Sequence, residues 1–215
     1  MAGRPMDRVV AWVSRRKLYR LVVLGPEAVG KTTLLNWLRG TWHEDELYEP
    51  TLALGASSTA RVTSNGDRLM LPDLRDLSGK AEAYPVWEER AERADIVVYL
   101  VNAVHLYAYQ QAVPAVTENW PQIAADWQRI VDDASQIEPW LWDRCIVVVT
   151  HRDMDPRFAE AAEPNEGAYL ATVEKQLGPI VNSLGGPRRV RLVAGSLNSR
   201  ANAKKLTNRI MEQLR

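Results

Sequence analysis

One stretch of the chain carries residues whose types and spacing suit the binding of phosphate. The stretch contains Gly25, Gly30, Lys31 and Thr32, which fit the pattern G-x-x-x-x-G-K-[ST]. Glycine at the first two positions lets the backbone turn tightly and point successive N–H groups inward, where no Cβ blocks an anion. The lysine can reach the β- and γ-phosphates of a nucleotide, and the threonine hydroxyl can ligate Mg²⁺. The stretch therefore predicts a phosphate-binding loop.

The segments on either side of this loop have the structure that its chemistry requires. Residues 21–24 form a short apolar run typical of a buried parallel strand. Residues 33–39 have helical apolar spacing and stop at Gly40, a residue type that often ends helices. The first amides of such a helix and the positive end of its dipole would face the same anion. A chance match in an ordinary loop is the alternative, and this context argues against it.

The composition describes an ordinary globular protein. The chain has 215 residues, of which 46% are hydrophobic and 25% charged, enough for one α/β domain with an insertion. Lys plus Arg equals Asp plus Glu at 27 each, so no overall field favours nucleic acid as a partner. The single cysteine, Cys145, rules out an internal disulfide or a cysteine-rich metal site. Without a signal peptide or a long apolar segment, we expect a cytoplasmic protein.

Strand and helix patterns alternate along the rest of the chain. Buried strands are expected at residues 95–101, 145–149 and 190–193, and helices at 105–143 (interrupted by Pro114, Pro121 and Pro139), 166–184 and 199–214. Between residues 61 and 71, two shorter strand candidates flank an Asn-Gly pair, which is a strong hairpin signal. The pattern predicts a doubly wound, mostly parallel, six-stranded sheet with helices on both faces and one antiparallel edge strand. Ligands of such folds bind at the carboxyl ends of the strands.

The chain is expected to divide into an N-terminal segment, residues 1–17, and a nucleotide-binding domain, residues 18–215, with an insertion around residues 105–143. The N-terminal segment is basic, and its apolar residues lie at helical spacing. An amphipathic helix of this kind could attach to a membrane through residues 4–17. Because a second anchoring signal is missing, we expect it to pack on its own domain or on a partner protein instead.

Further motifs follow the first helix and the later strands. In chain order they are Tyr48-Glu49-Pro50-Thr51, Asp76-Leu77-Ser78-Gly79, Thr150-His151-Arg152-Asp153-Met154 and Gly195-Ser196-Leu197. With the phosphate-binding loop, they resemble the motifs of the small GTPases of the Ras and Arf type, over nearly the whole chain. They are similar to that family's switch I, its D-x-x-G of switch II, its N/T-K-x-D guanine motif and its short base-contacting loop. Glu27 and Tyr84-Pro85-Val86-Trp87 look like features of the Arf branch.

The resemblance implies a P-loop NTPase fold of the GTPase class, with GTP or GDP and Mg²⁺ as ligands. In that family the switch I threonine, here Thr51, closes on Mg²⁺ and the γ-phosphate, and the tyrosine, here Tyr48, covers the nucleotide. The switch II aspartate, here Asp76, holds the metal through water, and the N–H of Gly79 meets the γ-phosphate. Asp153 would be the main determinant of guanine selectivity. The implied metal-binding residues are Thr32, Thr51 and Asp76.

The resemblance also assigns contacts position by position. The implied nucleotide-binding residues are Gly25, Glu27, Ala28, Val29, Gly30, Lys31, Thr32, Thr33, Tyr48, Thr51, Asp76, Gly79, Thr150, His151, Asp153, Ser196 and Leu197. The residues implied in catalysis are Lys31, Thr51, Gly79 and Lys80. Protein effectors or regulators are expected to bind the switch regions, residues 41–57 and 76–93.

Some positions depart from the family's pattern. Lys80 follows Gly79, where active members usually have the glutamine that orients the attacking water, and a lysine has no acceptor for that water. We therefore expect slow hydrolysis that a partner stimulates. His151 replaces the usual lysine of the guanine motif and could stack on the base, while Thr150 in place of asparagine loses an amide donor. After the expected strand at 95–101, Asn102-Ala103-Val104-His105 takes the place of an aspartate that is common in the family.

The tryptophans are unusually many, eight against one phenylalanine. Trp120, Trp127, Trp140 and Trp142 gather in the expected insertion. They predict either a local core that covers an added helix or a partner-binding surface, because tryptophan is favoured in both settings.

Three functions are compatible with the sequence. Lys31, Thr32, Thr51 and Asp76 favour a nucleotide-dependent molecular switch, which is our leading hypothesis. Lys80 favours a non-hydrolysing scaffold subunit that keeps the fold. A small-molecule kinase would need a basic lid, and the middle of the chain shows no cluster of arginines.

Overall fold

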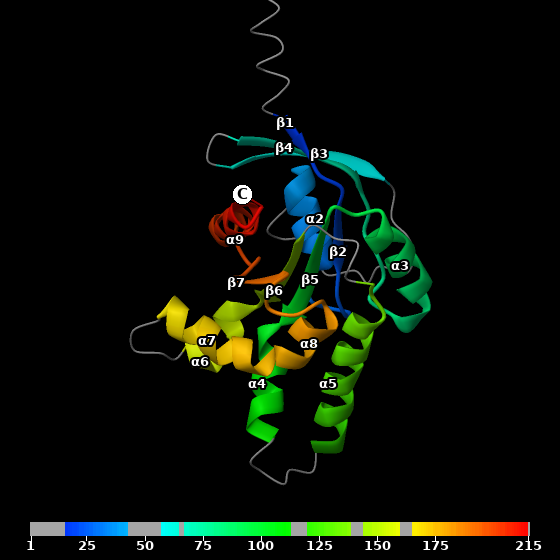
Figure 1. The fold of residues 1–215 in the computed structure, drawn as a ribbon. Coiled ribbons are helices and arrows are strands. Elements are labelled where there is room, and N and C mark those ends of the chain that lie inside the picture. The colour runs from blue at the N-terminus through cyan, green and yellow to red at the C-terminus, as the bar shows by residue number, and fades with distance from the viewer. Residues whose placement is uncertain are drawn as a thin grey trace, which may run out of the picture.

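The apolar runs that predict buried strands lie at the centre of the molecule (Figure 1). The computed structural model describes residues 16–42, 57–64, 67–112, 120–138, 144–159 and 165–214. Its strands are β1 (Arg16–Leu18), β2 (Leu21–Leu24), β3 (Ser58–Ser64), β4 (Asp67–Leu74), β5 (Ile96–Asn102), β6 (Arg144–Thr150) and β7 (Val190–Ala194). Its α-helices are α2 (Lys31–Arg39), α3 (Tyr84–Glu92), α4 (Ala103–Ala112), α5 (Trp120–Ser135), α6 (Pro156–Ala159), α7 (Glu166–Gln176), α8 (Gly178–Ser183) and α9 (Arg200–Glu212). The 3₁₀ turns η1 (Ala81–Ala83) and η3 (Arg152–Met154) complete the described elements.

The strands form two hydrogen-bonded sheets. Strands β2, β5, β6 and β7 make a four-stranded parallel sheet in that order. Strands β1, β4 and β3 make a three-stranded sheet, in which β1 is parallel to β4 and β3 is antiparallel to it. The predicted α/β class, the parallel sheet and the antiparallel edge strand are confirmed, whereas the single sheet of six strands is not.

The two sheets meet where the chain changes partner between β1 and β2. The N–H of Tyr19 donates to the carbonyl of Met70 on the β4 side, at 3.1 Å. One residue later, the carbonyl of Arg20 accepts from the N–H groups of Asp95 and Ile96 on the β5 side, at 2.8 and 3.1 Å. One continuous stretch of chain therefore contributes an edge to each sheet. The expected boundary at residue 17 falls inside β1.

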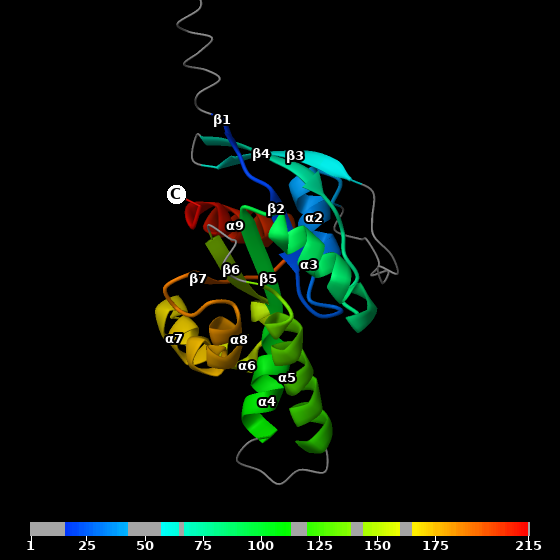
Figure 2. The ribbon, with the colours of Figure 1, turned by 45° about the vertical axis from the view of Figure 1, so that its right-hand side comes forward.

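Helices cover both faces of the parallel sheet (Figures 1 and 2). Helices α2 and α9 pack on one face, and α3, α4, α5, α7 and α8 pack on the other. Because both faces are covered, strands read as unbroken apolar runs, and every residue of β5 is buried. Side chains alternate between the faces along β5, so that Val97 and Tyr99 meet the larger helical layer while Ile96 and Val98 meet the smaller one.

Proline explains where the observed helices differ from the predicted ones. The helix expected over residues 166–184 is divided into α7 and α8 at Leu177, because Pro179 lies in the first turn of α8 and provides no N–H to continue α7. Pro121 does not interrupt a helix as predicted. It is the second residue of α5, in the first turn, where the missing N–H has no partner to lose. Helix α9 begins after its N-cap Ser199, in agreement with the prediction.

The predicted hairpin is present and longer than expected. Strands β3 and β4 are antiparallel, and Ser64 pairs with Asp67 at the last described step of the ladder. The Asn-Gly pair itself lies outside the described residues, as do Trp140, Trp142 and the predicted N-terminal helix. Of the tryptophans in the expected insertion, Trp127 is buried and stacks on Tyr109 with ring centroids 4.8 Å apart, which supports the local-core interpretation for that residue.

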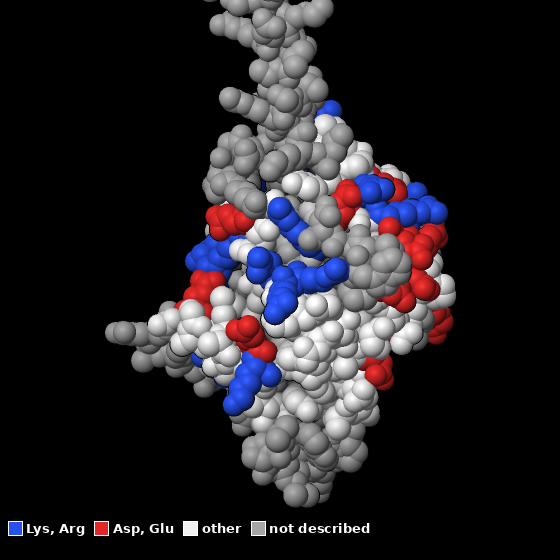
Figure 3. All heavy atoms as spheres, viewed as in Figure 1, with Lys and Arg blue, Asp and Glu red and all other residues white. Residues whose placement is uncertain are grey.

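The surface combines charged and uncharged regions. On the face shown in Figure 3, Lys and Arg side chains gather in the upper part, and the area over α8 is mostly uncharged. Helix α8 contains no Asp, Glu, Lys or Arg. Within the described ranges, no helix is long and apolar enough to cross a membrane.

Candidate functional site

The loop between β2 and α2 has the backbone that its glycines predict. Gly25 has φ 137°, and a Cβ on it would lie 2.5 Å from the carbonyl oxygen of Leu100 in β5. Gly30 has φ 90° and forms the N-cap of α2 without a side-chain cap. The first amides of α2 are therefore not covered by a capping side chain, which leaves them oriented toward any anion held by the loop.

Lys31 is enclosed by this loop. Its side chain is 7% exposed, and its Nζ donates to the carbonyls of Gly25 at 2.8 Å and Pro26 at 2.6 Å. Burial lowers the pKa of Lys31 to about 8, while nearby carboxylates, of which Asp76 has the largest effect, act in the opposite direction. The ammonium therefore stays charged at neutral pH, in a place where its charge is only partly compensated.

The D-x-x-G motif lies directly against the phosphate-binding loop. A Cβ on Gly79 would lie 2.5 Å from the backbone nitrogen of Glu27 and 2.7 Å from Nζ of Lys31. Real Cβ atoms do not approach so closely, so only glycine fits at this contact. The two motifs line one small hollow together with Ala28, Thr33 and Leu77. A hollow of about 600 Å³ lies elsewhere, between α2, β3 and α9, and contains none of the motif residues.

Two of the predicted metal-binding residues touch each other. The hydroxyl of Thr32 donates to Oδ2 of Asp76 at 2.6 Å. Asp76 is 7% exposed. A hydroxyl and a carboxylate are oxygen ligands of the kind that Mg²⁺ prefers, directly or through water, so the pair fits this ion. The third predicted residue, Thr51, lies outside the described residues together with Tyr48.

Switch II continues from Gly79 into helix α3. Trp87 of α3 is fully buried, and its Nε1–H donates to the carbonyl of Ser78 at 2.9 Å. This bond ties the helix to the loop that carries Asp76 and Gly79. Lys80 is exposed, and its backbone N–H donates to Oγ of Ser78 at 3.3 Å.

The guanine motif is joined to the phosphate-binding loop through Thr150. This residue is 1% exposed, and its Oγ1 lies 2.9 Å from the carbonyl of Val29 and 3.2 Å from that of Val101. The hydroxyl therefore connects β6 to the loop before α2 and to β5. Oγ1 also lies 3.0 Å from Nδ1 of His151. Burial lowers the pKa of His151, which favours a neutral ring at physiological pH.

Asp153 is held by the loop that follows β7. Its N–H donates to Oγ of Ser196 at 3.1 Å, and its Oδ2 accepts from the side-chain amide of Asn198 at 2.8 Å. Asn202 donates to the amide oxygen of Asn198 at 2.8 Å, which leaves the amide nitrogen of Asn198 to face Asp153. Leu197 of the same loop comes within 3.1 Å of a Cβ placed on Gly30.

The structure therefore gathers the predicted residues from three distant parts of the chain. Asn198 was missed by the sequence analysis, because an asparagine beyond a short loop has no signal of its own before its partner is known. Asn102, unexplained from sequence, accepts from the N–H of Val104 at 2.9 Å and so caps the start of α4.

Comparison with known proteins agrees with this geometry. The family model described as the ADP-ribosylation factor family matches residues 6–115, just over half of the chain. The matched part includes the phosphate-binding loop and the D-x-x-G motif, and it ends before the guanine motif. No curated protein matches the chain significantly. From the family match, the chain belongs to the ADP-ribosylation factor family of the Ras and Arf superfamily of small GTPases.

Proposed function

We propose that the protein is a GTP-binding molecular switch that uses Mg²⁺ and hydrolyses GTP slowly until a partner stimulates it. The observation that carries this proposal is the meeting of the motifs at one edge of the sheet. A Cβ on Gly79 would lie 2.7 Å from Nζ of Lys31, and the hydroxyl of Thr32 donates to Asp76. The loop after β7 then reaches the same place through the approach of Leu197 to Gly30.

In the proposed mechanism each group has a limited task. The ammonium of Lys31 and the amides at the start of α2 bind the β- and γ-phosphates. Thr32 and Asp76 would hold Mg²⁺, whose positive charge offsets the charge on the phosphates. The N–H of Gly79 would sense the γ-phosphate, and Trp87 would carry a shift of that loop into α3 through its bond to Ser78.

Selection of the base would depend on Asp153. Guanine presents N1–H and an exocyclic amine side by side, and the two oxygens of an ionised carboxylate accept both. Adenine presents an acceptor at N1 and no amine at C2, so it would leave the carboxylate unpaired. A site built around such a group can reject the wrong base by about 10⁴–10⁵.

Lys80 keeps a second function open for this chain. A fold that binds GTP and does not hydrolyse it would act as a scaffold subunit, and a lysine beside the attacking water offers no acceptor. A scaffold subunit that keeps a permanent nucleotide would differ from the switch in GTP hydrolysis and not in nucleotide binding.

The test is a competition of GTP, ATP and XTP against a labelled guanine nucleotide. For the wild type we expect GTP to compete far better than ATP or XTP. Asp153→Asn should reverse the preference toward XTP, because the C2 oxygen of xanthine accepts a hydrogen bond where the amine of guanine donates one. ATP competing with the wild type as well as GTP does would contradict the proposed function.

A further inference from the structure

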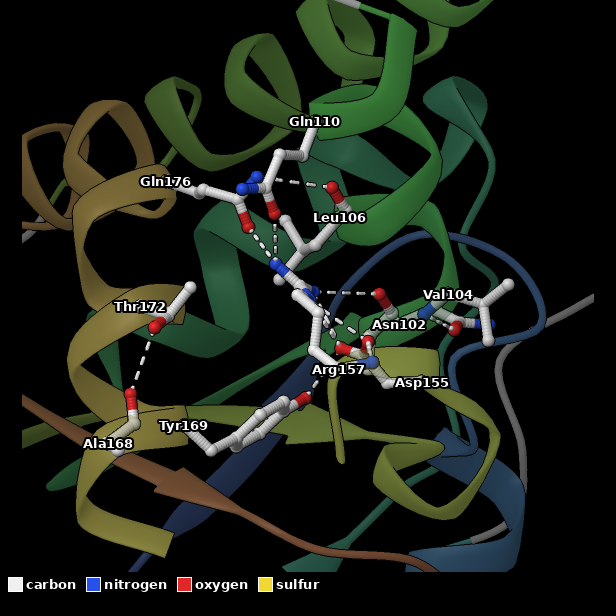
Figure 4. A network of polar contacts seen from close by, with 11 residues as sticks. Asn102, Val104, Leu106, Gln110, Asp155, Arg157, Ala168, Tyr169, Thr172 and Gln176 are labelled. Carbon is white, nitrogen blue, oxygen red and sulfur yellow. Dashed lines mark hydrogen bonds and ion pairs between the residues drawn. The ribbon is translucent and has the colours of Figure 1, made fainter. Parts of the chain in front are cut away.

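Beyond the guanine motif, a carboxylate and a guanidinium are packed together inside the protein (Figure 4). Asp155 is fully buried. Its carboxylate accepts from Nε of Arg157 at 2.9 and 3.1 Å, from Nη2 at 2.6 Å and from the backbone N–H of Arg157 at 3.0 Å. The hydroxyl of Tyr169 donates to Oδ2 at 2.9 Å, and burial, with the charge of Asp155, raises the pKa of Tyr169. Both oxygens are paired, as a buried carboxylate requires.

The rest of the Arg157 guanidinium reaches two other helices. Its Nη1 donates to the side-chain oxygens of Gln110 in α4, at 2.9 Å, and Gln176 in α7. Its Nη2 also lies 3.5 Å from the carbonyl of Ala103, the first residue of α4. One planar group thus joins α4, α6 and α7. A lysine would keep the positive charge beside Asp155. It could not donate to all these acceptors at once, because its single ammonium lacks the planar set of N–H donors of a guanidinium.

Asp153 stands two residues before this anchor. It belongs to η3, which ends where the N–H of Asp155 donates to the carbonyl of Arg152 at 3.2 Å. The turn has little apolar anchoring of its own, since Met154 is 61% exposed. On the other side of the turn, Thr150 is bonded to the phosphate-binding loop. The turn that carries Asp153 is therefore fixed at one end by Thr150 and at the other by Asp155, and between them it is bonded to the loop that follows β7.

We infer that Arg157 is a positioning residue for guanine selection. By holding Asp155, it fixes the turn on which the Asp153 carboxylate must meet N1–H and the 2-amino group together. Through Gln110 and Ala103, it makes that placement depend on α4. The inference rests on the proposed function, in which Asp153 reads the base.

The experiment compares GDP with IDP, which lacks only the 2-amino group of guanine. Dissociation constants of both are measured on the full-length protein by competition against labelled GDP. Arg157→Lys keeps a cation beside Asp155, and the double variant Asp155→Asn/Arg157→Gln replaces the ion pair with neutral amides. Arg129→Gln, on α5, is the control, because Arg129 is 65% exposed and pairs only loosely with Asp126 at 3.7 Å.

The wild type and the control should prefer GDP over IDP. Arg157→Lys should lower that preference about 10-fold, which corresponds to the loss of one charge-assisted hydrogen bond between the 2-amino group and Asp153. The double variant should lower the preference at least as much. General destabilisation would weaken both nucleotides equally and leave the ratio unchanged. A folded Arg157→Lys protein with the wild-type ratio would overturn this inference alone. A wild type without any preference for GDP would overturn the proposed function, and the inference with it.

Discussion

Asp133 of α5 is a buried carboxyl group close enough to interact electrostatically with Lys31 of the phosphate-binding loop. It is 1% exposed, and its Oδ1 has no hydrogen-bond partner in the described part of the chain. Burial raises the pKa of Asp133 to about 7, with Lys31 acting in the opposite direction. Near neutral pH this group therefore changes charge close to the ammonium that is proposed to bind phosphate.

The stability of the protein should depend on the ionisation of Asp133 between about pH 4 and pH 7. Folding raises its pKa, so its contribution is complete below about pH 4 and is lost as the pH rises to about 7. Asp133→Asn removes this dependence. The free energy of unfolding of Asp133→Asn minus that of the wild type should therefore be about 2 kcal/mol larger at pH 8 than at pH 5.

Urea unfolding at both pH values, with the same excess of GDP and Mg²⁺, measures this difference. Asp132→Asn is the control, because the neighbouring Asp132 is exposed. A difference between wild type and Asp133→Asn that does not change with pH would show that Asp133 ionises normally in the native state.

Substitution of Lys80 tests whether the protein hydrolyses GTP slowly or not at all. Lys80→Gln restores an acceptor beside the attacking water and should raise the single-turnover rate of GTP hydrolysis by about 10–100-fold. Lys80→Met removes the charge without adding an acceptor and should give no comparable gain. If the wild type already hydrolyses GTP rapidly alone and Lys80→Gln slows it, Lys80 itself takes part in catalysis.

The residues of the phosphate-binding loop could be predicted because they lie close together in the sequence and because the loop requires glycine at the positions with positive φ. Gly25 and Gly30 have the positive φ values that the motif requires. Asn198, Asp155 and Arg157 could not be predicted, because each acquires its role from a partner brought close only by folding. A lone Asp-Pro-Arg after a motif is otherwise an ordinary helix start.

Helix α3 is linked to the loop that would sense the nucleotide. The indole N–H of Trp87 donates to the carbonyl of Ser78 in that loop. Tyr84 packs on Trp87 with ring centroids 5.3 Å apart. Movement of the D-x-x-G loop should therefore change the surroundings of this indole.

Tryptophan fluorescence should report that change. We expect different emission with GDP and with a non-hydrolysable GTP analogue, and Trp87→Phe should remove most of the difference. Trp127→Phe is the control, since Trp127 stacks on Tyr109 within the α4–α5 pair. Identical wild-type spectra in the two states would favour the scaffold function.

Strands were easier to predict than helix ends. The run that became β5 is fully buried, and such a run has few alternatives to a central parallel strand. The break between α7 and α8 occurs because Pro179 lies in the first turn of α8. Pro121 also lies in a first turn, that of α5, and breaks no helix there. The change of partner at Tyr19 and Arg20 has no local signal, because it depends on where β4 and β5 lie.

At the scale of the molecule, the proposed site draws on both halves of the chain, so its ligand should stabilise the whole fold. A nucleotide present at 1,000 times its Kd adds about 4 kcal/mol. For a protein of this size that corresponds to a rise in Tm of roughly 8–16 °C. We expect this rise with GDP and Mg²⁺, a smaller one after chelation of Mg²⁺, and almost none with ADP. An equal rise with ADP would show that Asp153 does not select the base.

The contact between Gly30 and Leu197 also has a consequence for the synthesis of the protein. The ribosome releases the phosphate-binding loop long before the loop that approaches it, and at 5–20 residues per second the interval is roughly 8–33 s. During that time the nascent chain has the anion-binding backbone but lacks the residues that pack over it. A nucleotide held as the proposed site requires can therefore be acquired only after the loop that follows β7 has also been synthesised.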